Sequence, residues 1–509
     1  MGQTTILIMI LTIVSKIFGF VRESVMAAYI GAGELKSIYT TAMTIPYVLS
    51  GIVATGILSS YIPVYHKAMN EDGEERAKDF TSNLINTLLI YGAVAIVLVI
   101  LLARPLSKLF SPKLDGEALD IAIDFTRIMS LSILSFLSSS VLSGYLNIKG
   151  NFVDPVATGI ILNIVIIIST IFTGKVGNPY ILIIGTLIAQ ILQFIRFPFA
   201  SKKLGFKYKK IFNLKDIYIK YLMTMMIPII LSSTADQVSV LVDNSMASAF
   251  FGVASVSKIF YAKTMLNFIT GVVTMTVATV SFPEIAKLGQ AREIDKMKSS
   301  VSTAIIMTML LVIPATLGMM ALANPIIKLA FERNAFTSSD TLVVAGLMFS
   351  YGPFIIFTSF IKILGNAFYS VGDAKTPVII ILIQQAINIV LNFILVKFFG
   401  INGLALATAI STAIGTIIML IAFSKKIGSL NIKDSLISLM KITSSSLIIS
   451  SISAILYSFM SIRVGLILSL LLSASIAGMI YLLLIYLLRI NEVKDLLASF
   501  KNNIRERGE

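Results

Sequence analysis

The chain has 509 residues, of which 56% are hydrophobic and only 13% are charged, and its mean hydropathy is +0.91. A soluble protein carries about 25% charged residues, so this composition excludes an ordinary soluble domain. The absence of cysteine excludes disulfides and thiol catalysis, and the single histidine, His66, argues against a histidine-based metal centre. The net charge of +15 requires no nucleic-acid partner, because basic cytoplasmic loops orient membrane proteins.

Apolar runs long enough to cross a hydrocarbon core of about 30 Å recur along the whole chain. They predict an all-α polytopic membrane protein with about 14 transmembrane helices. The first run lacks a charged leading region and a small-residue cleavage site, so we expect it to remain as the first helix. The predicted spans are 4–30, 37–66, 80–103, 118–147, 155–173, 180–200, 217–250, 256–286, 299–323, 340–370, 377–397, 401–424, 436–460 and 464–488.

The first span contains three charged residues, Lys16, Arg22 and Glu23. At 1.5 Å per residue from Thr4, Lys16 lies roughly 18 Å deep and Arg22 roughly 27 Å deep. A cation at the midplane costs about 2.5–3.5 kcal/mol, so it normally faces a bundle interior or a water-filled cavity. The alternative for each cation is snorkelling or an ion pair with a neighbouring helix. Lys16 and Glu23 share a helix face, and we expect Glu23 to hold Lys16 or to gate the outer side.

The basic residues predict the orientation of the spans. Most of the 41 Lys and Arg residues fall in the inner loops and the C-terminal tail if the N-terminus lies in the cytoplasm, so we expect both termini there. The densest basic loop is SKKLGFKYKKIFNLKDIYIK, residues 201–220. It lies near the middle of the chain, and we interpret it as a linker between two lobes that rests on an anionic inner leaflet.

The two halves of the chain resemble each other at loops and turns, at a nearly constant offset. This repeat predicts two pseudo-symmetric six-helix lobes around a central cavity, which is a transporter design. The matched residues are Gly31, Ser37, Gly51, Pro63, Gly150 and Pro155, which recur as Gly252, Ser257, Gly271, Pro283, Gly372 and Pro377. The expected parts are an N-terminal lobe (1–200), the linker (201–220), a C-terminal lobe (217–430), a helix pair (431–490) and a cytoplasmic tail (491–509).

Lys263 gives the second lobe a cation at a place similar to that of the helix 1 cations. Cations from two pseudo-symmetric helices predict one cationic cavity that suits an anionic group such as phosphate. Lys362 is a weaker candidate for the same cavity, and Arg127 is as well explained by a position near the outer interface beside Asp124.

Polar side chains in later spans offer oxygen ligands for a hard cation. They are the carboxylate of Asp243, the amides of Asn388 and Asn392, which share a helix face, and the hydroxyl of Thr408. Hydrogen bonding between helices is an equally good interpretation of these groups. No hydrolytic site and no Walker P-loop occur in the sequence, so we predict a transporter rather than an enzyme.

Several segments resemble signatures of the MurJ/MviN family, in order along essentially the whole chain. They are SKIFGFVRESVMAAYIGAG (15–33), YAKTMLNFITGVVTMTVATVSFPEIAKL (261–288), FERNAFTSSDT (331–341), NAFYSVGDAKTPV (366–378) and GINGLALATAIS (400–411). The resemblance implies the MOP exporter fold, which is MATE-like, with the final helix pair forming a lipid-tail groove. It also implies flipping of lipid II, the undecaprenyl-pyrophosphate-linked peptidoglycan precursor, across the bacterial cytoplasmic membrane by alternating access, driven by membrane potential or sodium.

The resemblance also assigns site residues. Arg22 matches the second arginine of the family's helix 1, whereas Lys16 replaces the first arginine and Glu23 replaces an aspartate. Ser50 and Thr264 stand where the family has arginines. The implied substrate-binding residues are Lys16, Arg22, Glu23, Lys263, Ser50, Thr264 and Lys362, and the implied sodium site is Asp243, Asn388, Asn392 and Thr408, with Asn392 in place of an aspartate.

We considered three other functions for this sequence. A MOP flippase for another polyprenyl-linked oligosaccharide fits because some headgroup arginines are replaced. An ion-coupled multidrug exporter would have twelve helices and a carboxylate-lined cavity, and a scaffold for wall enzymes would have no use for buried charges. The expected partners are lipid II, membrane lipids and the peptidoglycan synthesis machinery.

Overall fold

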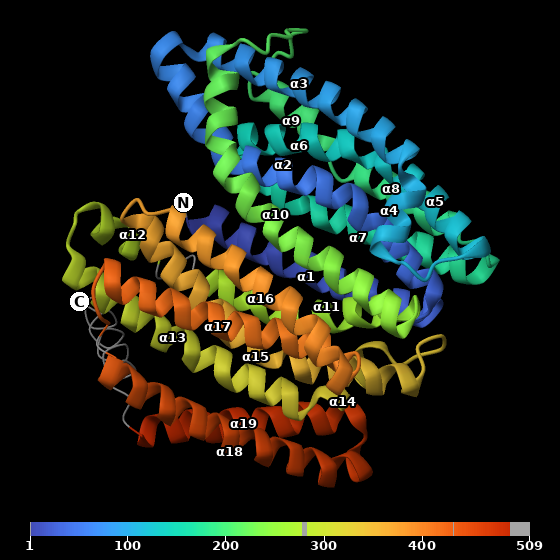
Figure 1. Ribbon diagram of the computed structural model, residues 1–509, viewed down its shortest axis with the longest axis vertical. Helices are drawn as coiled ribbons and strands as arrows, with labels where there is room; N and C mark the ends of the chain where they lie inside the picture. The colour runs from blue at the N-terminus through green and yellow to red at the C-terminus, as the bar shows by residue number, and fades with distance from the viewer. Residues whose placement is uncertain (1, 277–281, 431, 489–509) are drawn as a thin grey trace. The chain divides into compact units, whose positions relative to one another are not determined.

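The computed structural model describes residues 2–276, 282–430 and 432–488, and every regular element in these ranges is an α-helix (Figure 1). The predicted cytoplasmic tail, 491–509, lies outside them. The helices are α1 (Gly2–Ile30), α2 (Glu34–Asp72), α3 (Glu74–Leu101), α4 (Ala103–Phe110), α5 (Gly116–Ser130), α6 (Ser132–Ile148), α7 (Val153–Val176), α8 (Tyr180–Leu192), α9 (Arg196–Lys203), α10 (Ile217–Phe251), α11 (Ala254–Thr276), α12 (Phe282–Gln290), α13 (Ile294–Ala321), α14 (Ala323–Phe331), α15 (Ser338–Ser370), α16 (Lys375–Phe399), α17 (Asn402–Lys426), α18 (Ile432–Val464) and α19 (Leu466–Leu487).

Within the described residues, 11 helical segments are long and apolar enough to cross a membrane. The helices α1, α10 and α11 occupy the other three predicted spans. The predicted all-helical membrane class is therefore confirmed. Predicted span 118–147 is divided at Leu131 into α5 and α6, and predicted span 180–200 is divided at residues 193–195 into α8 and α9. Ser130 and Ser132 donate hydrogen bonds to the backbone carbonyls of Arg127 and Met129, and such bonds compete with the helical ladder.

The chain divides into two compact units. Unit 1 comprises residues 1–260 and 331–337, and unit 2 comprises residues 261–330 and 338–509. The division falls within α11, and the basic linker 201–220 lies inside unit 1. Because these units group residues by contact rather than by sequence repeat, the lobe boundaries expected from the repeat stay a prediction.

The core of unit 1 is built around α2. This helix packs against α3, α5, α6 and α10, and its aromatic side chains fill the space between them. The ring of Tyr61 stacks on Phe80 with centroids 5.9 Å apart, and the ring of Tyr65 meets Tyr145 edge-on at the same distance. The buried hydroxyl of Tyr61 forms a 2.8 Å hydrogen bond with Thr81, so the aromatic layer leaves this polar group satisfied.

Unit 2 carries the last two helices. In Figure 1, α18 and α19 lie side by side, and α18 packs on α13. The hydroxyl of Tyr481 donates a 2.8 Å hydrogen bond to the carbonyl of Leu310, which ties α19 to α13. Small polar residues allow helices to approach closely in a membrane, where no hydrophobic effect drives their association. The buried serines of the pair include Ser446, Ser450, Ser453, Ser469 and Ser473.

Gly144 allows α6 to pack directly on α2. A Cβ atom at Gly144 would lie 2.5 Å from Cδ1 of Tyr61, which is fully buried. We expect Gly144→Ala to lower the melting temperature of the purified protein, because overpacking a tight core costs about 1–3 kcal/mol. Gly318→Ala is the matched control, since a Cβ there meets nothing within 4 Å and alanine favours a helix. Equal melting temperatures for the two variants would contradict the proposed packing.

Candidate functional site

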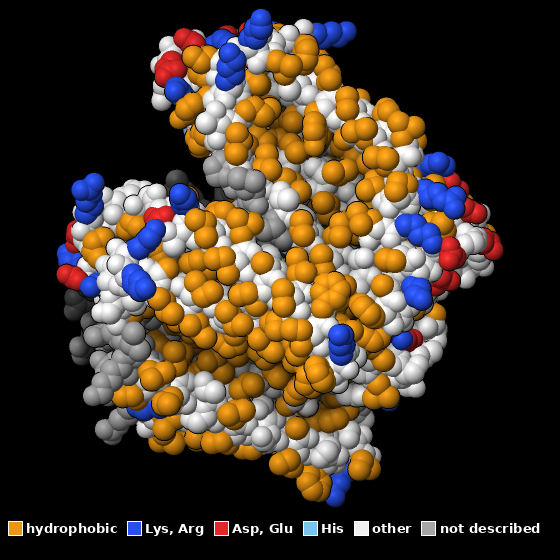
Figure 2. All heavy atoms as spheres, viewed as in Figure 1, with side chains coloured by type: hydrophobic (Ala, Val, Ile, Leu, Met, Phe, Trp, Pro, Cys, Tyr) orange, Lys and Arg blue, Asp and Glu red, His pale blue; other side chains and the backbone are white. Residues whose placement is uncertain are grey.

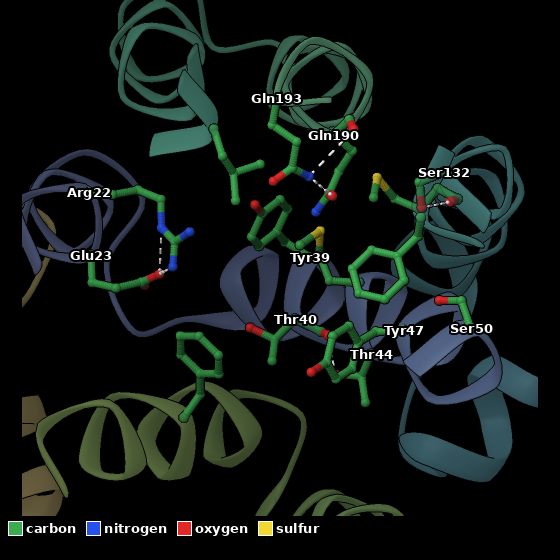
Figure 3. A pocket seen from close by; sticks show the side chains of 15 residues that line it. Arg22, Glu23, Tyr39, Thr40, Thr44, Tyr47, Ser50, Ser132, Gln190 and Gln193 are labelled. Carbon is green, nitrogen blue, oxygen red and sulfur yellow. Dashed lines mark hydrogen bonds and ion pairs between the residues drawn. The ribbon is translucent and has the colours of Figure 1, made fainter. Parts of the chain in front are cut away.

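A cavity of about 320 Å³ with both polar and apolar lining residues lies within unit 1. Its wall is formed by α1, α2, α5, α6, α7, α8 and the first turns of α11. Figure 3 shows Arg22 and Glu23 at one side of this space and the amides of Gln190 and Gln193 at another, with Tyr39 between them. A cavity with one charged corner and a wall of apolar side chains interspersed with neutral polar groups can bind an anion and the hydroxyl groups attached to it.

The charged corner is a cluster of three ionic side chains, which we name the ion cluster: Arg22, Glu23 and Lys36. Glu23 accepts hydrogen bonds at one oxygen from Arg22, at 2.6 and 2.9 Å, and at the other from Lys36, at 2.9 Å. Arg22 also donates a 3.0 Å hydrogen bond to Asn163 on α7. Glu23 is 2% exposed and Lys36 is fully buried, so each depends on the other for charge compensation.

The sequence analysis was wrong to leave Lys36 outside the predicted span 37–66, because α2 begins at Glu34 and includes Lys36 as a buried residue. The ammonium lies 4.4 Å from the ring centroid of Phe260 and 2.7 Å from the sulfur of Met26. The expected pairing of Glu23 with Lys16 is also wrong, because Lys36 takes that position and Lys16 is exposed on α1.

The neutral part of the wall was also missed by the sequence analysis. Gln190 and Gln193 are hydrogen bonded to each other, and Tyr39 is hydrogen bonded to Thr186 at 3.2 Å. Two amides three residues apart in an apolar span lie on one helix face, and this spacing was a usable signal. Ser50, which the family resemblance did indicate, lines the cavity and donates its hydroxyl to the carbonyl of Pro46.

The remaining substrate-binding candidates lie in unit 2. The ammonium of Lys263 lies 5.5 Å from the ring centroid of Tyr351, Thr264 is partly buried, and Lys362 is exposed. Of the substrate-binding candidates, the structure brings Arg22, Glu23 and Ser50 together around the cavity of unit 1.

Three of the four candidate sodium ligands form a hydrogen-bonded group in unit 2. The Asn388 amide donates to the Thr408 hydroxyl at 3.3 Å, and the Asn392 amide donates to the Asn388 carbonyl oxygen at 3.5 Å. Thr408 in turn donates to the backbone carbonyl of Leu404. The fourth candidate, Asp243, is 1% exposed on α10 of unit 1. Amide and hydroxyl oxygens are present, but a cation would have to replace the hydrogen bonds among them.

Comparison with known proteins gives a consistent result. The family model described as lipid II flippase MurJ matches residues 26–489. A probable lipid II flippase MurJ of Vibrio cholerae is 28% identical over 422 residues, 80% of each chain, and the lipid II flippase MurJ of Burkholderia cenocepacia is 25% identical over 426 residues, 82% of each.

Solved structures agree with the sequence comparisons. A lipid II flippase MurJ in an inward closed conformation superimposes with a TM-score of 0.82 at 26% identity, covering 97% of this chain and 100% of that one. An inward-facing MATE transporter of the MOP superfamily gives a TM-score of 0.68 at 14% identity, covering 84% of this chain and 99% of that one. The second similarity indicates a shared fold only.

The ion cluster predicts a specific pattern of rescue. Glu23→Gln leaves the buried Lys36 and the partly buried Arg22 without their carboxylate, and we expect a loss of about 3–5 kcal/mol in stability, measured as a lower melting temperature in detergent. Glu23→Gln combined with Lys36→Met removes one of the two cations, which returns the cluster to its original net charge of one positive unit, and should recover most of that loss. Glu23→Gln combined with Lys16→Met should recover none, because Lys16 is exposed. Recovery by the Lys16 combination alone would mean that the described pairing is incorrect.

Proposed function

The chain belongs to the lipid II flippase MurJ family, and from this membership we propose that the cavity of unit 1 binds the pyrophosphate of lipid II. The chain is a multi-pass membrane transporter rather than an enzyme, and it moves lipid II between membrane leaflets for peptidoglycan and cell wall synthesis. Neither a flippase for another lipid-linked oligosaccharide nor a multidrug exporter is favoured over this assignment.

The observation that supports pyrophosphate binding is the surplus charge of the ion cluster. Two cations, Arg22 and Lys36, share one carboxylate, Glu23, so the cluster has a net charge of one positive unit beside the cavity. The guanidinium has five N–H donors, and its hydrogen bonds to Glu23 and Asn163 use three of them. The donors that remain can form charge-assisted hydrogen bonds with a phosphate oxygen.

The size of the cavity limits what it can hold. Ligand pockets commonly have volumes of about 300–1,000 Å³, and this cavity of about 320 Å³ is at the lower end of that range. We therefore assign it the pyrophosphate and the nearest sugar, not the whole head group. The amides of Gln190 and Gln193 and the hydroxyl of Ser50 are suited to sugar hydroxyls.

We further propose that the polyprenyl tail lies along α18 and α19. These helices expose large apolar side chains, including Ile462, Leu482 and Tyr486, and few polar groups would compete for that surface. The bias of Lys and Arg toward one set of loops supports a location in the bacterial cytoplasmic membrane with both termini in the cytoplasm. Surrounding lipids and the peptidoglycan synthesis machinery are the proposed partners besides lipid II.

Sodium or the membrane potential is the proposed driving force. The hydrogen-bonded group of Asn388, Asn392 and Thr408 supplies oxygen atoms of the kind that hard cations prefer. Hydrogen bonds link the three neutral side chains to one another without an ion. Sodium would bind by displacing them, which is compatible with reversible coupling.

Arg22 provides the main test of the proposed function. Arg22→Ala should abolish growth rescue of flippase-depleted cells, and Arg22→Lys should rescue only partly because the ammonium lacks a planar fork. The matched control is Arg127→Ala, since Arg127 is half exposed beside Asp124 and lies outside the cavity wall. Membrane abundance of each variant and exposure of lipid II at the outer face are measured together. Normal lipid II flipping by well-expressed Arg22→Ala would refute the assignment.

The ion hypothesis is tested by flipping in vesicles containing the purified protein. If sodium couples to flipping, Asn388→Ala should remove the stimulation by sodium while leaving stimulation by a membrane potential. Gln384→Ala is the control, because Gln384 lies one turn earlier on α16 and is bonded to Thr412 rather than Thr408. Sodium stimulation that survives in Asn388→Ala would exclude this group as the coupling site.

A further inference from the structure

The chain between α9 and α10 lies along α3 as an ordered segment, residues 206–216, which we name the strap. Polar side chains of α3 bond its backbone. Asn83 donates its amide to the carbonyl of Asn213 at 2.9 Å and accepts from the backbone N–H of Asn213 at 2.8 Å. Asn86 donates to the carbonyl of Ile211 at 2.8 Å. The strap is thus held along its length.

Both ends of the strap are also fixed. At its start, the buried ring of Phe206 lies 5.2 Å, centroid to centroid, from the ring of Tyr145 on α6. At its end, Asp216 caps α10 by accepting from the backbone N–H of Tyr218, and it forms a 2.8 Å ion pair with Arg76. Because its backbone and both ends are bonded to the helices, the strap holds its outward side chains in a defined position.

Those outward side chains are of two kinds. Lys207, Lys210 and Lys215 are exposed, and no acidic partner is found for them among the residues that the structure covers. Tyr208, Phe212 and Leu214 are also exposed, each by half or more of its surface. Figure 2 shows Lys and Arg side chains gathered at this end of unit 1, with hydrophobic side chains along the flank below.

The three acidic residues of α3, beside the strap, are already engaged by other cations. Glu74 pairs with Lys149 at 2.6 Å, and Glu75 pairs with Lys78 at 3.0 Å. Asp79 is bonded by Lys209 of the strap itself. The three remaining lysines of the strap therefore contribute positive charge that the carboxylates of α3 do not neutralise.

The strap lies at the border of the lipid-exposed surface. The α3 side chains that bond the strap end at Asn86, and the exposed apolar surface of α3 begins at Ile90 and continues through Val94 to Leu101. Asn86 and Ile90 are one helical turn apart, or roughly 6 Å along the axis. Lysines at this depth reach phosphate groups, and aromatic side chains prefer the same interfacial zone.

We propose that the strap is a binding surface for anionic phospholipid head groups of the surrounding leaflet. Its lysines contact the phosphates, while Phe212 and Leu214 enter the boundary between head groups and acyl chains. This inference does not depend on lipid II transport. An acidic protein partner is the competing interpretation, and it predicts no preference among lipids in a bilayer that contains only this protein.

The test uses the full chain in nanodiscs of four parts phosphatidylcholine to one part phosphatidylglycerol. Because the sequence has no cysteine, Leu214→Cys provides one site for a fluorescent label on the strap. Acyl-chain-brominated lipid, either the phosphatidylglycerol or the phosphatidylcholine, then quenches the label in proportion to its local abundance. Each lysine near an anionic surface changes lipid affinity by about fivefold, so the enrichment is measurable.

We expect phosphatidylglycerol to quench the label several-fold more than its share of the bilayer predicts, and high salt to remove this excess. Replacing Lys207, Lys210 and Lys215 together by glutamine should reduce quenching to the bulk share. Glutamine at the exposed lysines 113, 175 and 397, in predicted outer loops, is the control and should change nothing. Salt-insensitive quenching at the bulk share in the unmodified strap, or unchanged enrichment in the strap variant, would overturn the proposal. Because no lipid II is present, either failure leaves the flippase assignment intact.

Discussion

The organisation of unit 1 depends on the imbalance of the ion cluster. Glu23 and Lys36 are buried and Arg22 is partly buried, and one carboxylate can neutralise only one of the two cations. The surplus charge must therefore face polar groups, water or an anion. That requirement explains why a membrane-embedded unit keeps a cavity with an amide- and hydroxyl-rich wall beside Arg22, where apolar packing would leave the charge uncompensated.

The ion cluster requires α1 and α2 to meet in a tight hairpin, and contacts remote in sequence support that hairpin. A Cβ atom at Gly31, whose φ is +77°, would lie 2.6 Å from the carbonyl oxygen of Ala335, so only glycine fits there. The backbone N–H of Ser257 donates a 3.0 Å hydrogen bond to the hydroxyl of Ser37. These contacts bring the start of α11 to the hairpin, which places Phe260 against the Lys36 ammonium.

Hydropathy predicted the helices well because each span must be long and apolar, a requirement that leaves little freedom. It could not set helix ends or helix rotation. Lys36 was missed because α2 starts at Glu34, three residues before the predicted span, and Lys16 was paired with Glu23 because they share a face. The long side chain of Arg22 instead reaches the adjacent Glu23. Tertiary packing, which the sequence pattern does not show, decides which cation is buried. Gln190 and Gln193 carry no charge, so they gave a weaker signal.

The strap shows the same limit at the surface. The sequence analysis interprets the Lys-rich segment 201–220 as a linker between two lobes that rests on an anionic leaflet, and it could not show that Asn83, Asn86 and Arg76 bond this segment to α3 as a part of unit 1. The two basic features of this unit therefore act over different ranges. Burial makes the ion cluster strong and local, whereas the exposed lysines of the strap are screened within about 8 Å at physiological salt. Only groups in direct contact with the strap can be selected by its charge, and at its depth on α3 those groups are lipid phosphates.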